Sequence, residues 1–351
     1  MDDRSTLRMT LDRLAVQGEL CAPLDRSWVL CYACGHRCRI SPGRYGICKI
    51  RENRAGVLFV PSGYTAGIAL DPIEKKPFFH ALPGSTALSF GMLGCDYHCA
   101  YCQNWITSQA LRDAAAGSRI EPATADQLVR LALAHGAQVV TSTYNEPLIT
   151  SEWAVEIFRL ARGAGLKTSF VSNGNATPEV LEYLRPHLDL YKVDLKSFRA
   201  DTYRRLGGRL ETVLETIRSL HRLGVWVEVV TLLVPGLNDS DEEVREIAEF
   251  VGSVSPQIPW HVTAFHGDYQ MTGSDRTTAR ALVRAAGIGR AAGLQFVYAG
   301  NLPGMTEGNE DTRCPSCRTV LIRRLGFRVA ENVITGGCCP RCRMRIPGVW
   351  A

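Results

Sequence analysis

The sequence lacks a long uninterrupted apolar run near its amino terminus. Residues 1–20, MDDRSTLRMTLDRLAVQGEL, carry a charge every few positions, whereas a signal peptide or a membrane span needs a continuous apolar stretch. The sequence also lacks the composition of a disordered chain, because 46% of its 351 residues are hydrophobic and 21% are charged. We therefore expect a globular, soluble protein of the cytoplasm with no membrane association.

Cysteine, by contrast, is abundant, with 13 residues. Because the cytosol keeps thiols reduced, so many cysteines without an export signal indicate metal binding or catalysis rather than disulfides. Cys21 stands alone, as a small core residue would. The other twelve form three groups: Cys31, Cys34, Cys38 and Cys48; Cys95, Cys99 and Cys102; and Cys314, Cys317, Cys338, Cys339 and Cys342.

Positive charge gathers at the two cysteine-rich ends. The net charge is +5, and residues 314–351 hold seven arginines against one acidic residue, Glu331. A basic surface is most often simply solvated. Contact with a nucleic acid or another acidic partner stays open as an alternative that we do not favour.

From residue 86 onward, short apolar or β-branched runs alternate with amphipathic stretches, which indicates repeated βα units. Thr124 and Gln127 have the spacing of a capping box before a helix that Gly136 can end. Six or seven such units predict an α/β fold, a closed or partial (β/α) barrel. The expected strands are 86–90, 138–142, 167–171, 190–193, 226–232, 260–264 and 295–299.

Polar residues follow the ends of these expected strands, where a barrel of parallel strands collects its chemistry. The first of them are Cys95, Cys99 and Cys102, one thiolate fewer than an iron–sulfur cluster normally has. An iron without a protein ligand is open to a small molecule, as the fourth position of a catalytic zinc site is. Free thiols are the alternative, but they make a poor core, so we favour a cluster.

The segment CDYHCAYC, Cys95 to Cys102, resembles the CxxxCxxC signature of the radical SAM superfamily. The resemblance implies a partial (β/α)6-type TIM barrel, a 4Fe-4S cluster on the three cysteines, and S-adenosylmethionine (SAM) on the open iron. One electron from the cluster would then cleave SAM to methionine and a 5′-deoxyadenosyl radical that abstracts hydrogen, with the protein positioning the cofactor. Tyr101 would lie beside the adenine.

The same resemblance assigns further SAM contacts. TYNEP takes the place of the family's Gly-Gly-Glu type stretch without its glycines. Thr143, Asn145 and Glu146 would therefore meet the amino group of the methionine, the alternative being a helix-capping turn before Pro147. Asn173 would meet the ribose or methionine, although Asn-Gly is also a common turn.

VDLK resembles the Asp-x-Lys element of pyruvate formate-lyase activating enzymes. It implies Lys196 near the SAM carboxylate with Asp194 beside it, an ordinary ion pair being the alternative. His266 matches the place of a histidine near SAM in those enzymes.

A narrower resemblance is to the radical SAM component of the AmmeMemoRadiSam system. It implies Memo-type and AMMECR-type partners and, as for other radical SAM enzymes, an electron donor such as flavodoxin or ferredoxin; it does not identify the substrate. The segments that carry it are DPIEKKPFFHALPGS, QNW after the cysteine motif, TYNEP, VDLKSF, LLVPGLNDS, WHVTAFHGDY, YAGNLPG and CPSC.

The two terminal cysteine groups offer four soft ligands each. Cys31, Cys34, Cys38 and Cys48 suit zinc or a second iron–sulfur cluster, with zinc preferred because iron–sulfur spacings vary widely. CPSC and CPRC form two knuckles typical of a zinc ribbon. Such a metal site would stabilise a carboxyl-terminal segment that is too small to form its own hydrophobic core. Its expected ligands are Cys314, Cys317, Cys339 and Cys342, with Cys338 able to replace Cys339.

The chain is thus expected to divide into a cysteine-rich segment and β-rich lead-in (1–80), a radical SAM core barrel (81–305) and a zinc-ribbon-like domain (306–351). The favoured function is a radical SAM enzyme whose substrate, a protein among the alternatives, is not identified. The second hypothesis is a glycyl-radical enzyme activase. The third hypothesis is a non-enzymatic zinc protein that binds nucleic acid. It gives no role to the polar residues that follow the ends of the expected strands.

Overall fold

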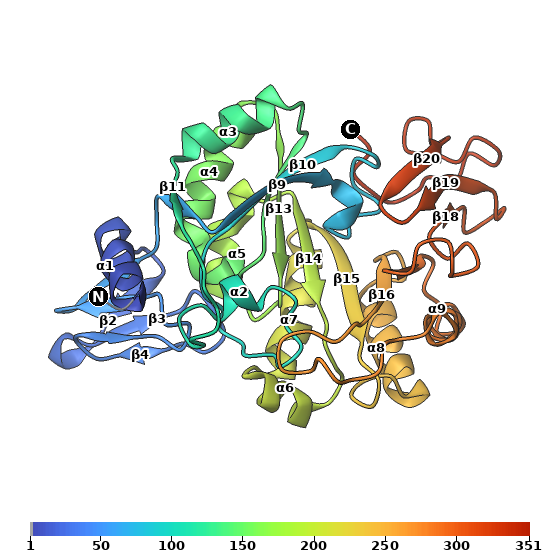
Figure 1. The fold of residues 1–351 in the computed structure, drawn as a ribbon. Coiled ribbons are helices and arrows are strands. Elements are labelled where there is room, and N and C mark those ends of the chain that lie inside the picture. Colours follow the sequence, from blue (N-terminus) through green and yellow to red (C-terminus); the bar gives the residue numbers. More distant parts are fainter. Residues whose placement is uncertain (1–2) are drawn as a thin grey trace.

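A computed structural model describes residues 3–351 and places one eight-stranded sheet at the centre of the molecule (Figure 1). Seven of its strands pair in parallel, and β9 pairs antiparallel with β10 at one edge. In sheet order, the strands are β17 (Val297–Gly300), β16 (Trp260–Ala264), β15 (Trp226–Leu233), β14 (Leu190–Asp194), β13 (Lys167–Ser172), β12 (Val139–Ser142), β10 (Thr86–Gly91) and β9 (Gly67–Pro72).

Helices connect the parallel strands and cover one face of the sheet, so the fold is a partial (β/α)6-type barrel, as the sequence predicted (Figure 1). The predicted capping box is confirmed: Gln127 N donates to Thr124 Oγ1 at 3.2 Å, and Thr124 N donates to Gln127 Oε1 at 2.9 Å. The helices are α2 (Trp105–Ser108), α3 (Ala125–Ala134), α4 (Ser151–Gly163), α5 (Pro178–Leu184), α6 (Ala200–Leu206), α7 (Leu210–Arg222), α8 (Asp241–Val254) and α9 (Ala279–Ala291).

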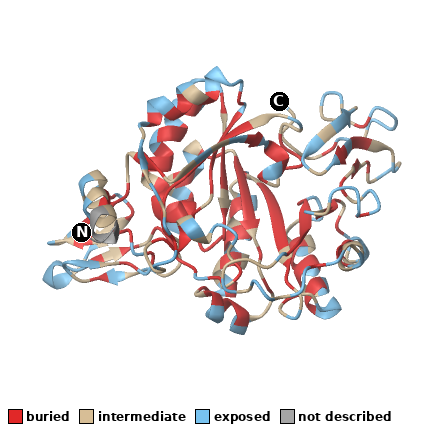
Figure 2. Ribbon diagram, viewed as in Figure 1, coloured by how far each residue is buried: buried red, intermediate tan, exposed pale blue. Residues whose placement is uncertain are grey.

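The hydrophobic core lies between the sheet and the helices. The central strands are buried along most of their length, whereas the helices expose their outer faces (Figure 2). β16, for example, is buried at all five positions, including its polar residues His261 and Thr263. Among residues 3–351, no helix is long and apolar enough to cross a membrane.

The amino-terminal segment forms a lobe of short strands beside the barrel (Figure 1). Arg51 anchors this lobe to α4: it is 1% exposed and donates to both carboxylate oxygens of Glu152, at 2.7 and 2.6 Å. The elements are α1 (Asp3–Leu14), β1 (Val16–Gln17), β2 (Cys21–Pro23), β3 (Val29–Cys31), β4 (Arg39–Ile40), β5 (Arg44–Tyr45), β6 (Glu52–Arg54), β7 (Val57–Val60) and β8 (Tyr64–Thr65), which pairs with β11 (Glu121–Pro122).

The carboxyl-terminal segment forms a small sheet of β18 (Thr312–Arg313), β19 (Val320–Leu325) and β20 (Arg328–Asn332). Buried contacts fix it to the segment between β9 and β10. Arg324 Nη2 donates to Phe79 O at 2.7 Å, and His80 Nδ1 lies 2.7 Å from Pro347 O. The division at residues 80 and 305 stays a prediction, and β9 of the expected lead-in belongs to the barrel sheet.

Candidate active site

The loop after β10 carries the three central cysteines. β10 ends at Gly91, where an added Cβ would lie 2.6 Å from Thr143 O, so only glycine lets the loop pass the end of β12. Cys95, Cys99 and Cys102 all line one cavity of about 400 Å³. The carboxyl ends of β12, β13 and β14 line the same cavity, which is the rim where a barrel of parallel strands places its chemistry.

Burial disfavours the ionised form of all three thiols, and a bound metal would favour it. Burial raises the pKa of each, that of Cys99 to about 12 despite the nearby charge of Lys196. Metal binding would therefore displace three thiol protons. Three soft sulfur donors beside an open cavity fit a 4Fe-4S cluster that keeps one iron free of protein ligands.

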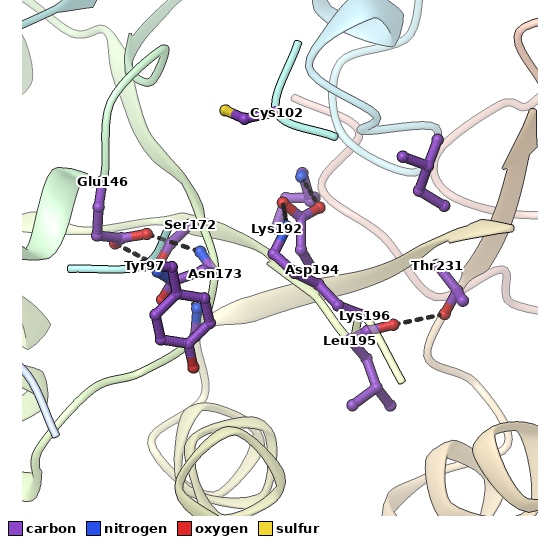
Figure 3. A network of polar contacts seen from close by, with 12 residues as sticks. Tyr97, Cys102, Glu146, Ser172, Asn173, Lys192, Asp194, Leu195, Lys196 and Thr231 are labelled. Atoms are coloured by element: carbon purple, nitrogen blue, oxygen red, sulfur yellow. Dashed lines mark hydrogen bonds and ion pairs between the residues drawn. The ribbon is translucent and has the colours of Figure 1, made fainter. Parts of the chain in front are cut away.

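Two buried carboxylates, Asp96 and Glu146, fix the cysteine loop to the ends of β12 and β13; Figure 3 shows Glu146 beside Ser172 and Asn173. Asp96, between two of the cysteines, is fully buried and accepts hydrogen bonds from Asn173 Nδ2 at 2.7 Å and Asn175 Nδ2 at 2.8 Å. Glu146 accepts from Ser172 Oγ at 2.7 Å and from Asn173 N at 2.8 Å. Burial, and then the charge of Asp96, raises the pKa of Glu146 to about 8.

Asn145 and Tyr144 shape the turn after β12. Asn145 Oδ1 accepts from Met92 N at 2.9 Å and so ties the turn to the cysteine loop. Tyr144 has φ of +71°, in the left-handed region that favours glycine. The resemblance described above implies glycines in this turn, and the sequence has none. At Tyr144 the backbone nevertheless adopts a conformation that glycine adopts without strain.

Two lysines and an aspartate project from one face of β14 and its end (Figure 3). Asp194 pairs with Lys192 and, at 3.1 Å, with Lys196, and all three line the cavity. Burial acts to raise the pKa of Asp194, but the two lysines outweigh it and lower that pKa to about 2. For Lys196 burial acts to lower the pKa, and the charge of Asp194 reverses the effect, so that the pKa is raised.

The aromatic Tyr101 forms part of the cavity wall. It is 5% exposed and packs edge-on against Phe265, with 6.5 Å between ring centroids. Val230 and Leu232 of β15 add apolar surface to the same cavity. Such a wall can exclude water from a bound molecule.

Comparison with known proteins identifies the family. Residues 91–251 match the model of the radical SAM superfamily. MJ0808, an uncharacterized protein of Methanocaldococcus jannaschii, is 36% identical over 307 residues, which are 87% of this chain and 90% of that protein. This chain belongs to the radical SAM superfamily. Radical SAM membership makes it an enzyme and implies a 4Fe-4S cluster and SAM as its cofactors.

This radical SAM enzyme is also similar to pyruvate formate-lyase activating enzymes, as predicted. That of Clostridium pasteurianum is 26% identical over 179 residues, 49% of this chain and 71% of that protein. A solved domain of the enzyme from Bacteroides vulgatus is 20% identical, covers 46% of this chain and 98% of that domain, and has a TM-score of 0.41. The narrower resemblance to the AmmeMemoRadiSam component stays a prediction.

The structure brings together most of the residues expected to bind the radical SAM cofactors. His266 is the exception: it is exposed, does not line the cavity, and contacts Gln103 at its edge, with 3.0 Å between Nε2 atoms. The expected residues that line the cavity are Tyr101, Thr143, Asn145, Glu146, Asn173, Asp194 and Lys196, together with Cys95, Cys99 and Cys102.

Sequence reasoning missed Lys192, Asn301 and the Lys75–Lys76 pair, which also line the cavity. Lys192 could have been found, because it lies two residues before Asp194 on the same strand and alternate residues share a face. Asn301 and the Lys75–Lys76 pair follow the two edge strands, β17 and β9, and only the curvature of the sheet brings them to the same cavity.

The carboxyl-terminal cysteines form a compact set of metal-ligand type. The sulfurs of Cys314 and Cys342 lie 3.5 Å apart and those of Cys317 and Cys339 lie 3.6 Å apart, and all four lie within 4.8 Å of one another. Cys338 lies outside this set, and its backbone forms an isolated antiparallel β-bridge with Arg345. The four sulfurs could therefore hold one metal ion, with Cys339 rather than Cys338 as the ligand.

Proposed function

We propose that this radical SAM enzyme binds SAM in the cavity beside Cys95, Cys99 and Cys102 and uses it to abstract hydrogen from a substrate. When bound, the cluster supplies one electron that cleaves SAM to methionine and a 5′-deoxyadenosyl radical. The observation that carries the proposal is that three thiols and the cation of Lys196, all buried or partly buried, converge on one cavity of about 400 Å³. That volume is in the range of small-molecule sites.

The chain's own residues would orient SAM through charge and shape. Lys196 offers a cation to the carboxylate of the methionine, and Asp194 holds that lysine in place at 3.1 Å. Tyr101 offers an aromatic face next to the last cysteine for the adenine. Asn173 already donates one hydrogen bond to Glu146 and another to Asp96 of the cysteine loop. The main role of Glu146 and Asn173 would therefore be to keep the ends of the strands rigid.

A second candidate is a glycyl-radical enzyme activase, which would install the radical on a partner's backbone. Similarity to pyruvate formate-lyase activating enzymes over about half of the chain favours it. The two terminal cysteine groups weigh against it, because the minimal activase pattern lacks them. In either case an electron carrier of the flavodoxin or ferredoxin type would supply the electron, and Memo-type and AMMECR-type proteins are the proposed partners.

The test is SAM cleavage by anaerobically prepared enzyme with a strong reductant. We expect 5′-deoxyadenosine and methionine in equal amounts from the wild-type protein. Cys99→Ala should abolish both products. Cys21→Ala, at the cysteine outside the three groups, should leave turnover unchanged. Unchanged turnover in Cys99→Ala would reject the proposal.

To separate the two candidates, the enzyme would be incubated with its Memo-type partner and, separately, with a glycyl-radical enzyme. A glycyl radical signal by electron paramagnetic resonance (EPR) that forms on the glycyl-radical enzyme, and not on the Memo-type protein, would favour the activase. Substrate-dependent 5′-deoxyadenosine without that signal would favour the first candidate.

A further inference from the structure

The amino-terminal cysteine group lies against the radical SAM loop and has the features of a built metal site. Cys31, Cys34 and Cys48 are about 95% buried. Cys38 Sγ accepts a hydrogen bond from Ile47 N at 3.5 Å. Backbone amides also interact with the sulfurs of Cys34 and Cys48. The four cysteines therefore form one largely buried group, with a backbone amide directed at the sulfur of Cys38.

A glycine and a buried arginine complete the surroundings of this group. An added Cβ on Gly46 would lie 3.6 Å from Cys38 Sγ and 3.7 Å from Cys48 Sγ, so the chain passes closely between the two sulfurs. Arg51 is 1% exposed and interacts with Cys31 and Cys48 as well as with Glu152. Its Nε has no hydrogen-bond partner among the described residues. The buried ion pair of Arg51 and Glu152 therefore borders this cysteine group.

The spacing of the sulfurs separates zinc from a cluster. Thiolates around one zinc ion lie about 3.8 Å apart, because each is about 2.3 Å from the metal in a tetrahedron. Among residues 3–351, only the carboxyl-terminal set meets such a spacing, with all four sulfurs within 4.8 Å. The amino-terminal four do not form such a set, and neither do Cys95, Cys99 and Cys102, the expected ligands of the first cluster. Cluster thiolates bind different irons and therefore lie farther apart.

We infer that Cys31, Cys34, Cys38 and Cys48 hold a second iron–sulfur cluster rather than zinc. With four protein thiolates, this cluster has no open iron and does not bind SAM. The inference replaces the preference for zinc that the sequence alone supported. It does not depend on which substrate the radical SAM site acts upon.

The loop of the amino-terminal cysteines packs directly against the radical SAM loop. Arg112 joins the two cysteine loops: it donates to Ile47 O at 2.6 Å and to Tyr97 O at 2.8 Å. Gly94, next to Cys95, approaches Cys48 so closely that an added Cβ would lie 3.1 Å from Cys48 O. The inference therefore includes magnetic coupling between the two reduced clusters.

A third connection runs through the buried carboxylate of the radical SAM loop. Gly35, between two of the amino-terminal cysteines, donates its amide to Asn175 O at 2.7 Å. The side chain of Asn175 in turn binds Asp96 at 2.8 Å. The amino-terminal loop is thus part of the wall that holds Cys95 and Cys99 in place.

Metal analysis of the full chain, purified anaerobically without added iron, tests the assignment. We expect about eight iron atoms and about one zinc ion per chain, the zinc from the carboxyl-terminal set. The double variant Cys34→Ser and Cys38→Ser should keep about four iron atoms, and its EPR signal should still change on addition of SAM. Cys21→Ser should keep all eight. About four iron atoms and two zinc ions in the wild-type chain would overturn the inference.

A second variant keeps the test valid if the amino-terminal double variant does not fold. Replacing Cys95, Cys99 and Cys102 by alanine should leave about four iron atoms with an EPR signal that SAM does not change. Loss of all iron in that variant would reject the second cluster. The first cluster is tested separately, by the SAM-cleavage assay on the wild-type enzyme. Fully reduced wild-type enzyme should show an EPR spectrum broadened by spin coupling, and a simple sum of two spectra would reject the packing.

Discussion

Three charged residues on one face of β14 line the active-site cavity. Lys192, Asp194 and Lys196 form a chain of contacts, and the aspartate is shared between the two lysines. Because Asp194 pairs with both, it stays ionised over the whole physiological range, with a pKa lowered to about 2. Two positive charges for one negative leave this face of β14 with a net positive charge, which suits a carboxylate ligand.

Replacing Lys196 tests this reading of the cavity. Lys196→Met should raise the Kd for SAM by about 10- to 100-fold, since a hydrogen bond to a charged group contributes about 1.5–3 kcal/mol. Equilibrium dialysis with the cluster-loaded enzyme measures it. Lys167→Met, at the opposite end of β13, is the matched control and should not change the Kd. An unchanged Kd for both variants would contradict the assignment of Lys196.

Replacing neighbouring cysteines tests the carboxyl-terminal ligand set. Cys339→Ala should remove one metal ion per chain, because its sulfur is within 4.8 Å of the other three. Cys338→Ala should retain the ion, since that cysteine lies outside the set. Inductively coupled plasma mass spectrometry of both variants gives the answer. Metal loss from the Cys338 variant alone would show that the ligand assignment is reversed.

The helices and strands of the barrel were largely predictable, because each depends on local pattern. The capping box at Thr124 and the seven parallel strands appeared in the structure where the sequence placed them, within a few residues. β9 was not predicted as part of the sheet, since its antiparallel pairing with β10 depends on contacts across the loop between them. That the amino-terminal cysteine sulfurs fall outside a compact set of the zinc type likewise has no local signal.

The cap of α3 gives a prediction for one element. Thr124→Ala removes the acceptor for Gln127 N and should lower the free energy of unfolding by about 1 kcal/mol. Thr124→Ser retains a capping hydroxyl and should stay close to wild type. Thermal denaturation of the three proteins under identical metal loading measures the difference. Equal Tm values for the alanine and serine variants would show that the cap does not stabilise the fold.

At the scale of the whole molecule, one buried carboxylate joins the barrel to the segment that holds the carboxyl-terminal domain. Glu228 of β15 is fully buried and accepts hydrogen bonds from Phe79 N at 3.0 Å and His80 N at 2.8 Å. It also pairs with His261 at 2.7 Å. His80 in turn contacts Pro347 O near the end of the chain, so the two regions are mechanically linked.

Replacing this carboxylate by an amide tests the link. Glu228→Gln puts an amide group among donors, leaves at least one buried donor without an acceptor, and should cost about 2 kcal/mol or more. We expect a lower Tm and faster proteolysis of residues 306–351. Glu249→Gln, on the exposed face of α8, is the control and should behave as wild type. A Tm equal to that of the control would contradict the proposed role.

The central claim is that Cys95, Cys99 and Cys102 hold a cluster with one iron left open for SAM. Mössbauer spectroscopy of the enzyme enriched in ⁵⁷Fe, recorded with and without SAM, tests it most directly. The account predicts that SAM changes the signal of one iron site, and that the change disappears in Cys99→Ala. A spectrum that SAM leaves unaltered, in wild-type protein with its full iron content, would contradict it.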